Sequence, residues 1–293
     1  MHHAHLNNER VLDMFYKPEI CREAWAEEKR NSPIGDTYAD IEAWGKFWDY
    51  ISSTYKGPND HEYVLKIVDF LRADGAFNEN ASVLDIGCGP GTYTLPFLKA
   101  GAKQVDCVDI SEGMLSELKE SAESEGLQNR VGIFPCTWGD YQSEKKYNLV
   151  FSSMSPAISE YDELLRMEEF SAGKCCLVTY GNSGSQYQIQ SRLWEALRGS
   201  RINSEVFNAI YPFNVLYSMG RHPNMKTFCK RSTSRMTLEK AYEHYLVYFE
   251  IFGYTSETDK RIIRENLDEV AQDGFCSEDT VSCVSVIWWS VHD

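Results

Sequence analysis

Three glycines and one aspartate in the segment 83–92 could form a ligand-binding turn. The apolar residues around Asp85 predict a buried strand, and Gly87, Gly89 and Gly91 follow it directly. A turn from a strand into a helix needs positive φ angles, which glycine adopts readily, and the missing side chains let a ligand approach the backbone. Asp85 could then accept hydrogen bonds from a ligand ammonium or from amides of the turn.

The spacing of these glycines differs from two common nucleotide-binding loops. Residues 87–91 form G-x-G-x-G, whereas a dinucleotide fingerprint is G-x-G-x-x-G, and the chain has no G-x-x-x-x-G-K-[ST] phosphate loop. A carboxylate two residues before the first glycine is also unfavourable beside an anionic dinucleotide. The pattern D-x-G-x-G-x-G resembles motif I of the class I S-adenosylmethionine-dependent methyltransferases.

A second acidic residue ends the next predicted strand, Lys103 to Asp109, 18 residues past the last glycine. An acid at the tip of the second strand can accept hydrogen bonds from both ribose hydroxyls, so Asp109 is the expected ribose ligand. Ile110 would pack on the adenine, and Ser111 would cap the helix Glu112 to Glu125. The methyltransferase family has the same order of motif I, helix and acid. An isolated aspartate could instead only cap a helix, but the glycine loop favours the cofactor.

The resemblance implies an α/β fold with a doubly wound, seven-stranded, mostly parallel sheet, whose last strand is antiparallel. It implies a methyltransferase domain over residues 60–293, with helical inserts at about 186–218 and 237–272, and an N-terminal helical lid over 1–59. The cofactor implied is S-adenosyl-L-methionine. Its contacts are expected from the glycine turn and from the ends of strands two to four: Asp85, Gly87, Cys88, Gly89, Gly91, Thr92, Asp109, Ile110, Met114, Thr137, Trp138 and Ser152.

Two of these expected contacts follow the third predicted strand. In the family an acid and then an apolar residue commonly bind and cover the adenine at this point. Trp138 fits the ring-covering role, but Thr137 stands where the acid is expected. Either the Thr137 hydroxyl with a backbone amide, or Asp140 reaching back, would have to replace the acid.

The end of the fourth predicted strand, Tyr147 to Ser152, faces the transferring methyl group in this family. Ser153 and Met154 follow it, and the Asp/Asn-Pro-Pro-aromatic signature of amino methyltransferases is absent from this position. This absence disfavours a planar amide or base nitrogen, and it favours a smaller or less polar acceptor. The serines could equally serve only a tight turn.

Aromatic residues outside the sheet are candidates for acceptor or lid contacts. The segment from 36 to 54 has an aromatic face at helical spacing, which includes Trp48, and Tyr55 follows it. Further aromatic residues lie in the helices predicted over 187–198, 210–220 and 238–252, and they suit a flat or apolar small molecule or a homodimer interface. Two more helices are predicted over 201–208 and 259–272. His61, His222 and His244 are candidate bases, each more commonly structural, so the catalytic residue stays unknown.

The composition narrows the function classes. The 293 residues carry a formal charge of −15, which argues against a nucleic-acid partner, and no apolar run is long enough for a membrane span. Nine scattered cysteines without C-x-x-C predict reduced, mostly buried thiols, neither a zinc site nor a disulfide framework, and a cytoplasmic protein. Methylation of a small molecule is the favoured function. The alternatives are a protein or RNA acceptor, a non-catalytic cofactor-binding protein and a nucleotide-dependent oxidoreductase.

Overall fold

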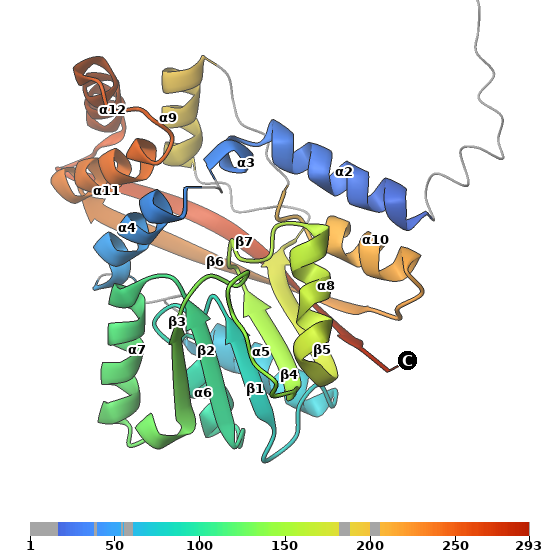
Figure 1. Ribbon diagram of the computed structural model, residues 1–293. Helices are drawn as coiled ribbons and strands as arrows, with labels where there is room; N and C mark the ends of the chain where they lie inside the picture. The colour runs from blue at the N-terminus through green and yellow to red at the C-terminus, as the bar shows by residue number, and fades with distance from the viewer. Residues whose placement is uncertain are drawn as a thin grey trace, which may run out of the picture.

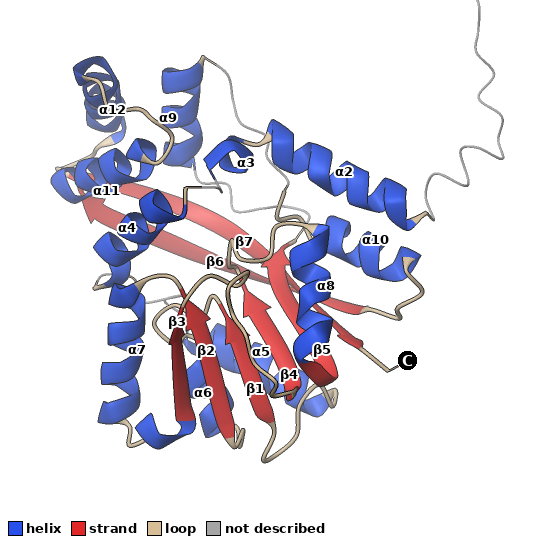
Figure 2. Cartoon of the chain, viewed as in Figure 1, coloured by secondary structure: helices blue, strands red, loops and turns tan. Residues whose placement is uncertain are grey.

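The computed structural model describes residues 17–37, 40–53, 55, 61–181, 188–199 and 206–292. A seven-stranded sheet in the order β3-β2-β1-β4-β5-β7-β6 runs through the molecule (Figures 1 and 2). Its strands are β1 (Ser82–Ile86), β2 (Gln104–Asp109), β3 (Val131–Pro135), β4 (Tyr147–Ser153), β5 (Ser171–Tyr180), β6 (Asn224–Thr237) and β7 (Phe275–Ser290).

Strands β1 to β5 are parallel to one another, and β7 is antiparallel to both β5 and β6. The predicted doubly wound sheet with an antiparallel last strand is therefore confirmed. Its central strands are apolar along their length because helices cover both faces. Cys175 and Cys176 on β5 illustrate this arrangement, since both are buried and each belongs to the core on a different face, as their alternation predicts.

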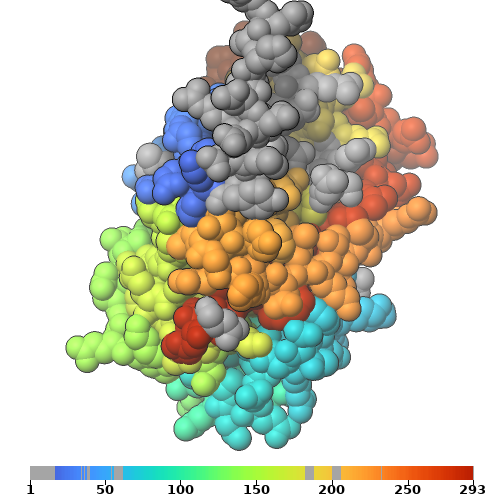
Figure 3. Space-filling model, turned by 90° about the vertical axis from the view of Figure 1, so that its right-hand side faces the viewer, coloured from blue at the N-terminus to red at the C-terminus, as the bar shows by residue number. Residues whose placement is uncertain are grey.

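Three helices cover each face of the sheet. One face packs against α5 (His61–Ala73), α6 (Thr94–Lys99) and α7 (Glu112–Ser124). The other face packs against α8 (Tyr161–Phe170), α10 (Ile210–Ser218) and the N-terminal helix α2 (Pro18–Asn31). The indole of Trp25 anchors α2 in this second core, where its Nε1 donates to the Val206 carbonyl at 2.8 Å. In Figure 3 the segment that carries α10 (orange) forms a broad part of the surface on that side.

A separate cap extends from the sheet on the β6–β7 ribbon. The β5–β7 pairing ends at Tyr180 opposite Val284, whereas β6 and β7 stay paired as far as Thr237 and Phe275. The helices α9 (Gln188–Arg198), α11 (Leu238–Glu250) and α12 (Glu257–Val270) pack around the far half of this ribbon (Figure 1). The cap has its own apolar core, which includes Trp194 and Phe249.

The remaining N-terminal helices are α3 (Pro33–Thr37) and α4 (Ile41–Ser52), and a short 3-10 helix η1 (Gln128–Arg130) precedes β3. Helix α4 packs against both α7 and α11, so it connects the sheet domain to the cap (Figure 1). Within the described ranges, no helix combines the length and apolar character needed to cross a lipid bilayer.

Two local predictions need correction. The predicted helix over 201–208 falls mostly outside the described residues, and its last residue, Asn208, forms a β-bridge with Tyr180. The Asn208 side chain accepts from the Ile210 amide at 3.0 Å, just before α10 begins. The second correction concerns the cysteines, which were predicted to be reduced. Cys229 of β6 and Cys283 of β7 instead form a disulfide bond.

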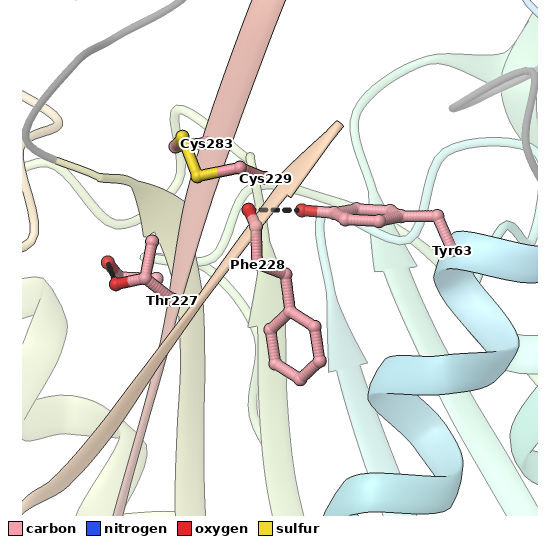
Figure 4. The surroundings of a disulfide bond; sticks show 6 residues. Tyr63, Thr227, Phe228, Cys229 and Cys283 are labelled. Atoms are coloured by element: carbon pink, nitrogen blue, oxygen red, sulfur yellow. Dashed lines mark hydrogen bonds between the residues drawn. A yellow bond between two sulfur atoms is a disulfide. The ribbon is translucent and has the colours of Figure 1, made fainter. Parts of the chain in front are cut away.

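The disulfide escaped prediction because it depends on strand register and not on sequence spacing. Cys229 and Cys283 are 54 positions apart in the chain but lie directly opposite each other in the β6–β7 ladder, with their Cα atoms 4.0 Å apart. The pair lies where the ribbon leaves the main sheet, since the Cys283 carbonyl accepts from the Gly181 amide at 2.8 Å. Figure 4 shows Tyr63 of α5 beside it, with its hydroxyl donating to the Phe228 carbonyl at 3.3 Å.

Alkylation of the unfolded protein without reductant should modify seven of the nine cysteines, and all nine after reduction. For a closed loop of this length, reduction should lower the free energy of unfolding by about 2 to 4 kcal/mol. Mass spectrometry and denaturant titration measure both quantities. A variant with Cys229→Ser and Cys283→Ser is the control, because its stability should not respond to reductant. Modification of all nine thiols in the unreduced protein would contradict the disulfide.

Candidate functional site

The glycine turn between β1 and α6 has the predicted backbone. Gly87, Gly89 and Gly91 have φ angles of 65°, 52° and 87°, which confirms the left-handed conformation expected from their spacing. The Gly87 amide donates to the Val108 carbonyl at 2.7 Å, so the turn is attached to β2. At Gly89 a Cβ would meet nothing within 4 Å, which leaves the backbone open to a ligand.

The acid at the end of β2 is hydrogen-bonded to this turn. Asp109 Oδ2 accepts from the Gly89 amide at 2.8 Å, and its Oδ1 accepts from the Ser111 amide at 3.0 Å. Burial raises the pKa of the Asp109 carboxyl, and the amides that donate to it partly oppose the rise. A carboxylate has about four acceptor positions, so both oxygens can still receive ribose hydroxyls.

Asp85 is buried at the end of β1, with 2% of its surface exposed. Its Oδ2 accepts from the Thr94 hydroxyl at 2.7 Å. Burial raises the pKa of Asp85 to about 7; the Thr94 hydroxyl opposes this, and the nearby charge of Asp109 adds to it. Amides of the turn are one of the predicted partners of Asp85, but the Gly89 amide donates its hydrogen bond to Asp109 instead. Among the described residues Asp85 forms no ion pair, so its carboxyl could receive a ligand ammonium.

The end of β4 borders the glycine turn. Ser152 is fully buried and its hydroxyl donates to the Ile86 carbonyl at 2.9 Å, so it ties β4 to β1. Ser153 shares a side-chain hydrogen bond with Tyr93. Met154 has a φ of 51° and is 36% exposed. The side chain of Ser155 comes so close to Gly87 that a Cβ there would lie 1.9 Å from the Ser155 Oγ.

Thr137 and Trp138, which follow the third strand, make hydrogen bonds and packing contacts within the protein. Trp138 is 4% exposed, stacks on Tyr141, and its Nε1 donates to the Glu163 carbonyl at 3.1 Å. The Thr137 hydroxyl donates to Asp140 at 2.7 Å. Covering an adenine would require Trp138 to leave this packing, because core contacts already use most of its ring surface. Thr137 and Asp140 are the two predicted substitutes for the missing acid. They are hydrogen-bonded to each other in a local turn.

Helix α4 packs on the start of α7, next to the end of β2. Trp48, Ile110 and Met114 belong to one apolar cluster, in which α4 and α11 pack on the start of α7. Trp48 stacks on Trp44, and Tyr55 makes an edge contact with Trp48 at 6.0 Å between ring centroids while remaining 37% exposed. The cluster brings the candidate lid residue Trp48 together with Ile110 and Met114, both expected cofactor contacts.

The candidate bases are separated from one another in the fold. His244 lies on α11 with its ring centroid 6.1 Å from that of Phe47, and burial lowers the pKa of its imidazole. His222 lies exposed between α10 and β6, and His61 is the first residue of α5. His244 is therefore the candidate base that packs against α4.

Four residues near the site were missed at the sequence level: Asp49, Tyr93, Thr94 and Ser155. Thr94, nine positions after Asp85, follows the glycine turn closely, so a motif that includes the first helical turn could have indicated it. The other three depend on contacts between segments far apart in the chain. They carry no local signal.

Comparisons with known proteins agree with this geometry. Residues 83–167 match the family model described as "Methyltransferase domain". A protein of Haemophilus influenzae named "Uncharacterized protein" is 26% identical over 212 residues, which cover 72% of this chain and 76% of that protein. Ribosomal protein L11 methyltransferase of Ruminiclostridium cellulolyticum is 30% identical over 82 residues, or 28% of this chain and 26% of its own length.

Among solved structures, magnesium protoporphyrin IX methyltransferase from Synechocystis PCC 6803 with bound S-adenosylhomocysteine has a TM-score of 0.47 and 14% identity, covering 85% of this chain and 94% of its own. The family match, the sheet order and the glycine turn together define a Rossmann-like methyltransferase fold. The match over residues 83–167 and this fold together support a methyltransferase that uses S-adenosyl-L-methionine.

Proposed function

We propose that this enzyme methylates a small-molecule acceptor bound between the carboxyl ends of the strands and the cap. The observation that carries this proposal is the apolar cluster between α4, α7 and α11. The ring centroids of Phe47 on α4 and Tyr248 on α11 lie 5.8 Å apart in it, and Ile110, which follows β2, and Met114 of α7 belong to the same cluster. Protein therefore covers this side of the site, an arrangement that favours a small, partly apolar acceptor over an extended chain.

In this proposal the acids at the ends of β1 and β2 hold the cofactor. Asp85 receives the ammonium of its amino-acid part, and Asp109 receives the ribose hydroxyls. Ile110 lies against the adenine, and the glycine turn lets the cofactor approach the backbone. The bound cofactor supplies an activated methyl group on a sulfonium, so the protein's task is in-line positioning and exclusion of water.

Proton removal is needed only if the acceptor is protonated when it binds. His244 is our candidate for that role, because burial lowers the pKa of its imidazole and so keeps it neutral near pH 7. An acceptor that arrives as a thiolate or a free amine needs no base.

A protein acceptor is the second candidate. Its support is the similarity to ribosomal protein L11 methyltransferases, but the matched segment covers only 26% of the length of the relative from Ruminiclostridium cellulolyticum. A match of 82 residues leaves most of the chain, and so most of any acceptor site, without a counterpart in that relative. A nucleic-acid acceptor is less favoured, because the chain carries a net charge of −15.

Calorimetric titration with S-adenosylmethionine and S-adenosylhomocysteine tests the site, with NAD as the control ligand. We expect micromolar binding of the first two ligands and none of NAD. An acceptor screen that follows S-adenosylhomocysteine release then tests the choice of a small molecule. Turnover with a protein substrate, and with no compound of the screen, would replace this proposal by the second candidate.

Substitution of Asp109 by alanine should weaken binding of S-adenosylhomocysteine by about 1 to 3 kcal/mol, or roughly 5- to 150-fold, because the ribose hydroxyls and the Gly89 amide lose their acceptor. The same calorimetric titration measures the loss. Asp106→Asn on the same strand is the control, since Asp106 accepts from Tyr147 and Lys145 instead. Unchanged affinity in the Asp109 variant would show that the ribose binds elsewhere.

A further inference from the structure

We propose that Asp49 is a positioning residue that fixes helix α4 against the cofactor-binding acid of β2. The proposal rests on the function proposed above, because it assigns the ribose to Asp109. Asp49 lies on α4, and its Oδ1 accepts from the Ser111 hydroxyl at 2.6 Å and from the Gly113 amide at 2.9 Å. One carboxylate oxygen thus binds the start of α7 from a different helix.

These bonds continue as far as the glycine turn. Ser111, whose hydroxyl donates to Asp49, also donates its amide to Asp109 Oδ1 at 3.0 Å. Asp109 Oδ2 in turn accepts from the Gly89 amide at 2.8 Å. Ser111 is fully buried, so water does not compete for its hydroxyl. A connected set of hydrogen bonds therefore links α4 to the residues proposed to hold the ribose.

The close contact of the two helices depends on a glycine. A Cβ at Gly113 would lie 2.8 Å from the Ser52 Oγ and 3.2 Å from the Asp49 Cα. The Ser52 hydroxyl is itself held in place, since it donates to the Asp49 carbonyl at 2.9 Å. Any side chain at position 113 would consequently push α4 away from α7.

The start of α7 favours a carboxylate at this position, while the like charge of Asp109 opposes it. The first amides of α7 have no acceptor within their own helix, and the helix dipole attracts a negative group there. Asp49 adds a second carboxylate close to Asp109, and both take hydrogen bonds from Ser111. With Asp49 in place, Ser111 and Asp109 have one fixed arrangement, and the apolar residues of α4 lie over Ile110 and Met114.

The structure provides a matched control on the same helix. Asp40 caps the start of α4, where its Oδ1 accepts from the Ala43 amide at 2.9 Å, and among the described residues no hydrogen bond joins it to α7. Replacement of either aspartate by alanine removes one carboxylate from α4. Only Asp49→Ala also breaks the connection to Ser111 and Gly113.

The experiment measures the affinity for S-adenosylhomocysteine and the KM for S-adenosylmethionine in Asp49→Ala, Asp49→Asn and Asp40→Ala. We expect Asp49→Ala to lower the affinity for S-adenosylhomocysteine and to raise the KM for S-adenosylmethionine, each about tenfold, with a smaller change in kcat. Asp40→Ala should leave the affinity and the KM near the wild-type values. Asp49→Asn keeps an acceptor oxygen and should recover most of the affinity. Gly113→Ala should reproduce the loss with Asp49 intact, so the test survives if Asp49→Ala folds poorly.

Three results would overturn the proposal, and they have different meanings. Equal losses in Asp40→Ala and Asp49→Ala, or no loss in Asp49→Ala and Gly113→Ala, would show that Asp49 only stabilises α4, while the proposed function would stand. Failure of the wild-type protein to bind either ligand would remove the proposed function itself.

Discussion

Replacement of Asp85 by asparagine is expected to stabilise the protein near pH 8 and to weaken its binding of S-adenosylmethionine. Asp85 is 2% exposed, and its hydrogen-bonding partner is the neutral hydroxyl of Thr94. An ionised carboxylate is unfavourable in such surroundings, since one neutral hydrogen bond replaces its hydration. Asparagine has the same shape and can still accept from Thr94, but it carries no charge.

The effect on stability has a defined pH dependence. Burial raises the pKa of Asp85 from 3.8 to about 7 in the folded protein. Between these two pH values the folded protein keeps a proton that the unfolded chain has lost, so folding becomes less favourable as the pH rises and then levels off. The loss of folding free energy grows by about 1.4 kcal/mol per pH unit and reaches roughly 4 kcal/mol above pH 7.

Asp85→Asn should therefore exceed the wild type in free energy of unfolding by about 2 to 4 kcal/mol near pH 8, and by roughly half as much or less near pH 5. Denaturant titration without cofactor at both pH values measures this difference. Thr94→Val is the companion variant, because it removes the donor to Asp85 and should destabilise the protein most at high pH. An advantage of the asparagine variant that did not depend on pH would contradict the buried titration.

The substitution that raises the stability should lower the affinity for the cofactor. A ligand ammonium stabilises the ionised form of Asp85, so the affinity of the wild type should rise from about pH 5.5 to pH 7. The asparagine variant should bind about 10- to 100-fold more weakly near pH 8, which corresponds to roughly 1 to 3 kcal/mol for a lost charged hydrogen bond. Its affinity should be nearly independent of pH over that interval. Wild-type affinity that is flat with pH would indicate that the ammonium binds elsewhere.

The sheet and the glycine turn could be predicted from the sequence because their signals are local. Buried parallel strands appear as short apolar runs, and the turn needs glycine at each left-handed position. Strands β2 (Gln104–Asp109) and β4 (Tyr147–Ser153) lie within one residue of the ranges predicted for them. The acid after β2 was found for the same reason, since its distance from the glycines is set by one helix and one strand.

Features that depend on contacts between distant segments could not be predicted in this way. The Cys229–Cys283 bond depends on the register of two strands separated by two helices. Trp138 has the spacing of an adenine-covering residue, but the packing of α8 draws its ring into the core. Asp49 is one of several acids in its segment, and only the docking of α4 on α7 distinguishes it.

Substitution of Gly87 by alanine should damage both stability and cofactor binding. The residue has a φ of 65°, which costs a non-glycine residue about 1 to 2 kcal/mol. Its new Cβ would lie 1.9 Å from the Ser155 Oγ and 2.4 Å from the Ser155 Cβ, far inside van der Waals contact. The segment after β4 would have to move. We expect the free energy of unfolding to fall by about 2 to 4 kcal/mol.

Gly75→Ala separates the two causes, because Gly75 has a φ of 71° and a Cβ there would meet nothing within 4 Å. Its loss measures the backbone cost alone, far from the glycine turn. Ser155→Gly removes both atoms that clash in the Gly87 variant, so the double variant should recover the remainder of the lost stability and part of the cofactor affinity. Ser155→Ala should recover little, since its Cβ still clashes.

A double-mutant cycle on unfolding free energies measures the coupling of Gly87 and Ser155, which we expect to be about 1 to 2 kcal/mol. Such coupling would place the end of β4 in direct contact with the glycine turn, so that a change at Ser155 alters how the cofactor lies relative to the acceptor. Losses that simply add would mean that the segment after β4 moves aside freely. The contact between Ser155 and Gly87 would then have no influence on the site.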